Sequence, residues 1–268
     1  WELAVLKNDE LSKVNSYKQY LKPEDLFYMN GFCNSLGEWM IPASTGAFTK
    51  RGDRLEKIYL PFADFISVTV FSCYEDIKSK VVYFGTTSGL FSYDLRNRKI
   101  RKCATDKRLV FSLDKDKYER LWVCTGKGVL LFKDNTFTPF KKNEIPVDKG
   151  VISCCRDFKG NMWFAGKDAL YFYTYTQKFK ISEGSYFFIN QYKNRYIIAG
   201  TIKGFLLIDL EKLYSHKLNF ARFFDRYNGF IGIECGQNGT CVDSKGNVWI
   251  PTSESVVKFM PDKLTLDT

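Results

Sequence analysis

The densest combination of polar, charged and aromatic side chains in the sequence lies in residues 222–238. A phenol ring stands there close to guanidinium, amide and carboxylate groups. Such a mixture suits polyhydroxylated or acidic sugars, because rings pack on sugar faces while polar groups bond to hydroxyl and acid groups. We predict a ligand-binding site whose candidate residues are Arg226, Tyr227, Asn228, Glu234, Gln237 and Asn238. The alternative is that residues 229–234 simply plug or cross one face of the fold.

Catalytic chemistry has few candidates in this chain. His216 is the only histidine, so a serine–histidine–aspartate set or a histidine-based metal site would rest on that residue alone. We predict that His216 lies in an exposed loop. Acidic residues are numerous, but no spacing singles out a pair for glycoside hydrolysis. We therefore expect no catalytic residue, no metal and no cofactor.

Asp157 and Asp243 each begin a turn that contains Lys-Gly-Asn. A calcium loop would need further carboxylates at alternate positions, where Lys159 and Lys245 stand instead. We predict that both aspartates accept hydrogen bonds from the turn backbone, and that Gly160 takes a positive φ.

The eight cysteines are an even number, which raises the question of disulfides. A chain of this length does not need them to be stable. Cys154 and Cys155 are adjacent on a predicted strand, so they point to opposite faces and do not pair with each other. Cys235 and Cys241 could meet across a loop or hairpin, and the sequence leaves that pairing open.

The elements that position these residues follow from a repeated phrase. A large aromatic or aliphatic residue opens a short strand, a turn of small residues follows, and a second apolar strand comes next. The anchors are 44, 39, 41, 35 and 51 residues apart, and they are Trp39, Tyr83, Trp122, Trp163, Ile198 and Trp249. A period of about 40 residues is the length of one propeller blade. The sequence predicts an all-β fold, a β-propeller of four-stranded antiparallel blades, with the repeated tryptophans packed between blades.

The number of blades depends on the first residue. Trp1 lies 38 residues before Trp39 and would open one further copy of the phrase. We therefore expect seven blades, with six as the alternative, in a single domain that covers residues 1–268. The last copy ends near Met260 without an obvious fourth strand. The widest spacing, 51 residues, contains the candidate site, which places that site in an insertion on a rim of the propeller.

The formal net charge of +10 raises the question of nucleic-acid binding. The lysines and arginines are spread through nearly every turn, whereas nucleic-acid sites cluster them on one face. The apolar runs are too short to cross a bilayer. We expect neither nucleic-acid binding nor direct membrane insertion by this chain. Because the sequence opens on Trp1, we expect a fragment or a processed form.

The copy that begins at Asp157 reads Asp-Phe-Lys-Gly-Asn-Met-Trp-Phe-Ala-Gly. It resembles the two-component regulator propeller repeat, which reads roughly Asp, two variable residues, Gly-Asn, an apolar residue, then Trp-Ile-Gly-Thr and Gly-Leu. Residues 228–234, 246–252 and 257–264 are similar to the closing blade of such propellers. The resemblance covers most of the chain, although Tyr83 and Ile198 replace the tryptophan of the repeat.

The resemblance implies a periplasmic sensory module of a two-component receptor, commonly one that detects carbohydrate breakdown products. It implies a parent protein with another propeller, a β-sandwich, a membrane span and a histidine kinase. The expected partners are an oligosaccharide ligand, the neighbouring propeller and β-sandwich domains, and a second copy in a homodimer. The fragment itself is then not an enzyme. The alternatives are a propeller lyase or glycosidase acting on a polysaccharide, and a protein-interaction scaffold without a small ligand.

Overall fold

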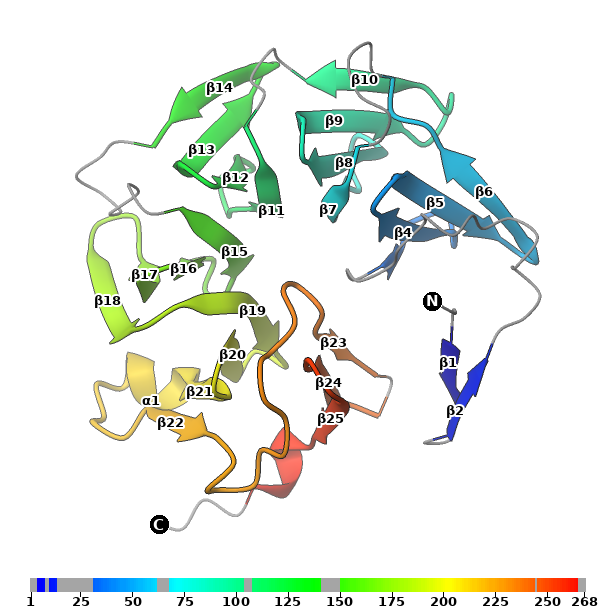
Figure 1. The fold of residues 1–268 in the computed structure, drawn as a ribbon. Helices are drawn as coiled ribbons and strands as arrows, with labels where there is room; N and C mark the ends of the chain where they lie inside the picture. The colour runs from blue at the N-terminus through cyan, green and yellow to red at the C-terminus, as the bar shows by residue number, and fades with distance from the viewer. Residues whose placement is uncertain are drawn as a thin grey trace. The chain divides into compact units, whose positions relative to one another are not determined.

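β-Strands make up nearly all of the regular structure (Figure 1). The computed structural model describes residues 4–7, 10–13, 31–61, 68–103, 108–140, 150–243 and 245–264. Tight turns separate the strands, and many turn positions take a positive φ, as the glycine- and asparagine-rich spacing predicts. The chain divides into two compact units, residues 1–110 and 111–268, which are described separately.

The first unit contains two four-stranded antiparallel sheets with their strands in chain order, the arrangement of a propeller blade. One sheet consists of β3 (Phe32–Cys33), β4 (Trp39–Ala43), β5 (Gly46–Arg51) and β6 (Arg54–Ile58). The other consists of β7 (Val70–Asp76), β8 (Val81–Thr86), β9 (Gly89–Asp94) and β10 (Ile100–Cys103). A separate hairpin pairs β1 (Ala4–Lys7) with β2 (Glu10–Lys13).

The second unit contains three four-stranded sheets and one three-stranded sheet. The first two are β11 (Val110–Lys115), β12 (Leu121–Thr125), β13 (Gly128–Lys133) and β14 (Thr136–Pro139), then β15 (Val151–Arg156), β16 (Met162–Gly166), β17 (Ala169–Tyr173) and β18 (Lys178–Glu183). The third is β19 (Tyr186–Tyr192), β20 (Tyr196–Thr201), β21 (Phe205–Asp209) and β22 (Ala221–Phe224), with helix α1 (Leu210–Tyr214) before its last strand. The last is β23 (Cys241–Val242), β24 (Val248–Pro251) and β25 (Val256–Phe259), followed by the 3-10 helix η2 (Pro261–Lys263).

Six blades are present in the part of the chain that the structure describes, five of four strands and one of three. The fold class is confirmed, whereas the expected seventh blade is wrong and the alternative of six holds. The reason is that β1 pairs with β2 alone among the described strands, in the register Ala4↔Lys13, and so forms a hairpin. Trp1 itself lies outside the described residues. The three strands of the last sheet agree with the missing fourth strand of the last copy.

Aromatic side chains fill the space between neighbouring blades of the second unit. Trp122 and Trp163 are both 0% exposed, and they belong to two successive apolar clusters. The ring of Trp122 lies 5.3 Å from that of Phe164 in the next blade. This packing confirms the prediction for these two tryptophans, because such contacts join sheets that cannot bury their faces singly.

Trp39 does not occupy the position of the other repeated tryptophans. It is 48% exposed, whereas Met40 beside it is 0% exposed. Met40 lies three residues before the strand end Ala43, as Trp122 lies three residues before Thr125. The first copy has one residue more between its anchor and its turn glycine, since Trp39 precedes Gly46 by seven positions and Trp122 precedes Gly128 by six. This extra residue moves the anchor by one position, and the prediction that Trp39 packs between blades is wrong.

Candidate functional site

An aspartate fastens the turn between the first and second strands of the β15–β16 blade. Oδ1 of Asp157 accepts hydrogen bonds from the backbone N–H groups of Lys159 at 3.0 Å and Asn161 at 2.9 Å. Oδ2 accepts from the indole N–H of Trp163 at 3.0 Å. Gly160 has a φ of 82°, as the sequence predicts, and this conformation lets the short turn close.

The same arrangement recurs at Asp116 and Asp243. Each of these aspartates accepts a hydrogen bond from the indole of the tryptophan six residues later, and each accepts two backbone N–H groups of its turn. The prediction for Asp157 and Asp243 is therefore confirmed. Asp116 was not predicted, although its spacing from Trp122 equals that of Asp157 from Trp163 and would have identified it.

Helix α1 adds a further donor to the Asp157 turn. The helix is N-capped by Asp209, whose carboxylate accepts the backbone N–H groups of Glu211 and Lys212. At its other end the hydroxyl of Tyr214 donates to Oδ2 of Asp157. Burial and the nearby carboxylate raise the pKa of Tyr214, so its hydroxyl stays protonated and remains a donor. The carboxylate of Asp157 thus accepts four hydrogen bonds from the protein.

Two adjoining concavities lie beside these turns, with volumes of about 450 and 440 Å³. They share Phe158, Lys159 and Asn194, and we name them together the basic groove. Its walls come from the β11–β12, β15–β16 and β19–β20 turns and from α1. The polar side chains that line it include those of Lys117, Arg156, Lys159, Gln191, Asn194 and Arg195. This site was not predicted from the sequence, although a repeat places the equivalent turns of successive blades on one side of the fold.

Positive charge dominates the basic groove. Its lining has four cationic side chains and two carboxylates, and one of these, that of Asp157, is 2% exposed and bonded within its own turn. Lys159 places its ammonium 3.8 Å from the ring centre of Tyr214. Lys117 similarly lies 4.6 Å from the ring centre of Tyr175. A ring face holds a cation in place but does not cancel its charge.

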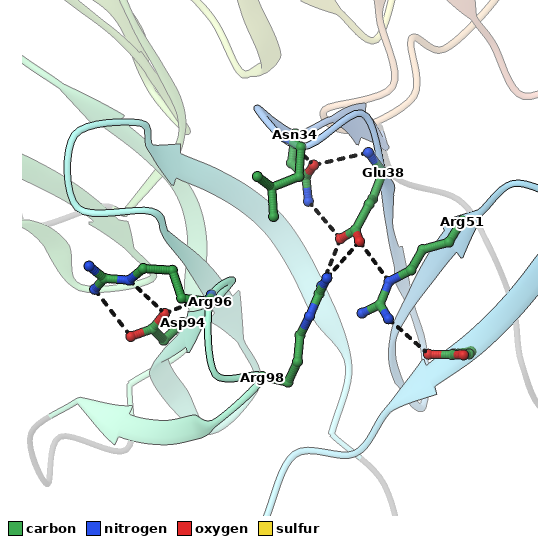
Figure 2. A network of polar contacts seen from close by, with 8 residues as sticks. Asn34, Glu38, Arg51, Asp94, Arg96 and Arg98 are labelled. Carbon is green, nitrogen blue, oxygen red and sulfur yellow. Dashed lines mark hydrogen bonds and ion pairs between the residues drawn. The ribbon is translucent and has the colours of Figure 1, made fainter.

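In the first unit, by contrast, two arginines pair with one carboxylate (Figure 2). Both terminal nitrogens of Arg98 donate to Glu38 at 2.7 Å, and Nε of Arg51 lies 2.7 Å from the same carboxylate. Asn34 completes the group, since its Nδ2 donates to Glu38 at 3.3 Å. The hydrogen bonds from Arg98 hold the pKa of Glu38 below its usual value, although burial opposes this. Glu56 lies 3.7 Å from Arg51, so the formal charges of the two glutamates and two arginines cancel, and we name this contact between the two blades of the first unit the Glu38 joint.

The predicted site residues fall into two groups, and the first lies in an exposed turn after β22. Tyr227 is 86% exposed, and the guanidinium of Arg226 lies 5.6 Å from its ring centre. Asn228 is engaged by the turn itself, because its Oδ1 accepts the backbone N–H of Asp225 at 2.7 Å. Its Nδ2 donates to the backbone of β22 at 2.8 Å. Phe230 then enters the apolar core at 2% exposure.

The second group lies where the insertion approaches the inner strands. Figure 1 shows this segment in orange, between β22 and β23. Asn238 donates from Nδ2 to the backbone oxygen of Phe111 on β11, at 2.9 Å, and from its backbone N–H to Phe187 on β19, at 3.3 Å. Nε2 of Gln237 is buried without a hydrogen-bond partner among the described residues, and Glu234 is exposed. In that part of the chain no hydrogen bond or ion pair joins the two groups.

All eight cysteines are free. Cys235 is buried, its thiol donates to the backbone oxygen of Gly204 at 3.3 Å, and burial raises its pKa to about 12. Cys241 is exposed, so the pairing that the sequence left open is not formed. His216 lies exposed in the turn after α1, with a φ of 55°, as predicted.

Within the described ranges, no three or more histidine, cysteine, aspartate or glutamate side chains are grouped so as to hold a metal ion. No helix there has both the length and the apolar character that crossing a membrane requires.

The fold resembles that of solved bacterial extracellular domains. It matches the extracellular domain assigned to a hybrid two component system of B. thetaiotaomicron with a TM-score of 0.79 and 21% sequence identity. The match covers 97% of this chain and 36% of that one, so the chain spans about a third of the length of this relative. At this identity the likeness establishes the fold. The resemblance to the propellers of two-component sensors is thus confirmed at the level of the fold.

Other solved structures share the fold at lower identity. PorZ, a surface component of the type-IX secretion system of Porphyromonas gingivalis, matches with a TM-score of 0.66 and 10% identity, over 93% of this chain and 41% of PorZ. A catalytically inactive virginiamycin B lyase from Staphylococcus aureus matches with a TM-score of 0.62 and 10% identity, over 89% and 86% of the two chains. No protein-family model and no curated protein sequence matches this chain.

Proposed function

We propose that this chain is a non-catalytic sensory propeller, the periplasmic ligand-receiving part of a two-component signalling receptor. The observation that carries the proposal is the likeness in fold, over 97% of the chain, to the extracellular domain assigned to a hybrid two component system. The proposed signal is a carbohydrate-derived ligand. The proposed ligand would be received by groups on the turns of the blades and on the insertion, above strands that are packed in the core.

The hydrogen bonds of three aspartates and the position of His216 support a binding role over catalysis. Asp116, Asp157 and Asp243 are engaged in fastening their own turns, where a general acid or base would need to face a substrate. His216 is exposed on a turn and lines neither concavity of the basic groove. The competing functions are a propeller lyase or glycosidase, and an interaction scaffold without a small ligand.

The proposed partners are other parts of the same receptor. A neighbouring propeller and a β-sandwich would flank this unit in the parent chain, and a second copy would complete a homodimer. A rigid propeller transmits a signal by reorienting as a body, since its packed blades do not deform gradually.

A ligand screen with product analysis tests the proposal. The purified chain is melted in the presence of neutral and acidic oligosaccharides, and the same mixtures are analysed for cleavage. A ligand at about one hundred times its Kd should raise the melting temperature by roughly 5 to 10 °C, with every sugar recovered intact. Turnover of any sugar would establish the enzyme alternative. Absence of stabilisation by every sugar would favour the scaffold.

A further inference from the structure

The lining of the basic groove carries an excess of positive charge, and its cations have few close ion-pair partners among the described residues. Arg156 and Lys159 are exposed and form no close ion pair with any described residue, although Asp114 lies near Arg156 and partly offsets its charge when it is ionised. Arg195 approaches Asp209 only at 3.8 Å. In the first unit, by contrast, Glu38 binds two arginines at 2.7 Å each. Cations that are ordered but not neutralised are suited to bind an anion, because no internal pair must be broken first.

The lysines of the groove are ordered by ring faces. Lys159 lies over Tyr214, and Tyr214 is itself fixed by its hydrogen bonds to Asp157 and Asn161. Lys117 lies over Tyr175, whose hydroxyl donates to the backbone oxygen of Gly160 at 2.9 Å. Both ammonium groups are therefore partly pre-organised, which reduces the entropy that a bound anion would have to overcome.

Neutral polar groups line the same groove. Gln191 donates from Nε2 to Oδ1 of Asn194 at 2.9 Å, while its own Oε1 is buried without a donor among the described residues. The contact with Gln191 orients the exposed amide of Asn194, whose N–H groups can donate to a sugar hydroxyl. Phe158, at 45% exposure, offers a ring face of the kind on which sugar C–H groups pack.

We propose that the basic groove binds an acidic saccharide, with Arg156 and Lys159 on its anionic group and with Gln191, Asn194 and Phe158 on its sugar ring. This inference rests on the proposed carbohydrate-sensing function and adds the location and the charge of the ligand. It moves the ligand site from the insertion to the turns of three successive blades.

Binding of two trisaccharides by isothermal titration calorimetry tests this inference. Trigalacturonate carries a carboxylate on each sugar, and maltotriose has the same length without charge. We expect trigalacturonate to bind and maltotriose to bind at least about tenfold more weakly, since charge-assisted hydrogen bonds are the stronger ones. Raising the ionic strength from about 0.05 to about 0.5 M should weaken trigalacturonate binding, because salt screens exposed charges.

Charge-removing variants locate the site. Arg156→Gln and Lys159→Gln should each weaken trigalacturonate binding about tenfold, and Lys159→Arg should largely restore it. The matched control is Lys203→Gln, which removes an equal charge from the exposed β20–β21 turn. Melting curves establish that each variant is folded. Inorganic sulfate is titrated in parallel as the anion without a sugar.

The outcomes separate the two proposals. If maltotriose binds as tightly as trigalacturonate, or if both groove variants bind like the wild type, the groove inference is overturned and carbohydrate sensing stands. If sulfate binds in the groove but neither sugar does, the saccharide part of the inference is overturned. If neither sugar nor sulfate binds, the groove inference is overturned, and the proposed carbohydrate response is decided by the wider oligosaccharide screen.

Discussion

The β3–β4 turn and the β15–β16 turn stand at equivalent places in the repeat but are fastened by different charges. In the first, Asn34 accepts the backbone N–H groups of the turn, and Glu38 then binds Arg51 and Arg98. In the second, Asp157 accepts backbone, indole and hydroxyl donors, all of them neutral. In the first turn one carboxylate holds two arginines, whereas in the second Arg156 and Lys159 form no close ion pair with a described carboxylate.

A position in the repeat therefore does not by itself determine what the charged side chains at that turn do. The counter-charge at the turn decides whether nearby cations join two blades or remain available to a ligand. Arg51 and Arg98 are joints in the first unit, whereas Arg156 and Lys159 in the second are candidates for binding. A substitution at one of these turns tests one side of the comparison while the other turn stays intact.

The largest expected effect comes from the indole that closes the second turn. Trp163 is 0% exposed and donates to Asp157, so Trp163→Ala should lower the free energy of unfolding by about 3 to 5 kcal/mol. Trp39→Ala is the matched control. Because Trp39 is 48% exposed, its loss should cost less than about 1 kcal/mol. Urea denaturation measures both, and equal costs would contradict the register that places Met40 in the core.

The strand register at Trp39 marks the limit of what could be predicted from the sequence. The period of about 40 residues predicted the blades, because each copy must form one sheet before neighbours can pack. The Lys-Gly-Asn turns predicted the hydrogen bonds from the turn backbone to Asp157 and Asp243, and also the positive φ of Gly160, because these features depend only on the local turn. The position of Trp39 failed because one extra residue shifts every side chain to the opposite face of a strand.

The candidate site was less accessible from the sequence. The insertion drew attention because it interrupts the repeat, but Asn228 and Asn238 both use their side chains to bond to backbone groups. The basic groove joins residues from turns about 40 residues apart, among them Lys117, Lys159 and Asn194. No short motif marks such a site, since it depends on which turns share a face and on which charges lack a partner.

A change at Glu38 should produce the next largest effect. Glu38→Gln leaves Arg98 without a carboxylate and Arg51 with only Glu56 at 3.7 Å, and it should lower the free energy of unfolding by about 2 to 3 kcal/mol. Glu56→Gln is the control, because Glu56 is exposed and lies 3.7 Å from Arg51, and it should cost about 0.5 kcal/mol. Urea denaturation at neutral pH compares the two. Similar losses would show that the joint in Figure 2 contributes no more than a surface ion pair.

The pH dependence of the Glu38 joint has a defined sign. The pKa of Glu38 lies below its ordinary value of 4.5, chiefly because of the hydrogen bonds from Arg98. The carboxylate therefore stabilises the fold fully above pH 4.5, and this contribution is lost as the pH falls through the lower, folded value. The stability difference between the wild type and Glu38→Gln should shrink in that acid range. A constant difference down to pH 3 would exclude Glu38 as the titrating group.

Gly160 tests the close approach of two turns in the basic groove. A Cβ at this position would lie 2.9 Å from Cβ of Lys117, and the φ of 82° is one that side chains rarely adopt. Gly160→Ala should cost about 2 kcal/mol and weaken trigalacturonate binding, because Lys117 must move. Gly229→Ala is the control, with a φ of 105° and open space around it, and should cost about 1 kcal/mol with unchanged binding. Equal binding by the two variants would remove Lys117 from the proposed site.

The smallest expected effect on stability comes from Asp114, a half-buried residue of β11 that accepts a hydrogen bond from a residue of the groove. Its carboxylate accepts the backbone N–H of Arg156 at 2.7 Å, and burial raises its pKa to about 6. The folded chain thus holds this proton more tightly than the unfolded chain, where an aspartate titrates near about 3.9. The contribution of Asp114 to stability is full below about pH 4 and is lost as the pH rises to about 6. Asp114→Asn should lack this decline and should differ from the wild type by no more than about 1 kcal/mol at pH 7, since an amide oxygen can still accept the N–H of Arg156.

The same titration sharpens the comparison of the two turns. Above about pH 6 the ionised Asp114 supplies a nearby negative charge that partly offsets Arg156, which makes the groove resemble the neutralised Glu38 joint. Below that pH the offset disappears while the carboxylates of trigalacturonate stay ionised, so the wild type should bind this sugar a few-fold more tightly at pH 5 than at pH 7.5. In Asp114→Asn the two affinities should be equal, because the amide has no charge to lose. Calorimetric titrations at both pH values decide this, and a pH-dependent affinity that persists in the variant would assign the titration to another group and leave Arg156 uncompensated at every pH.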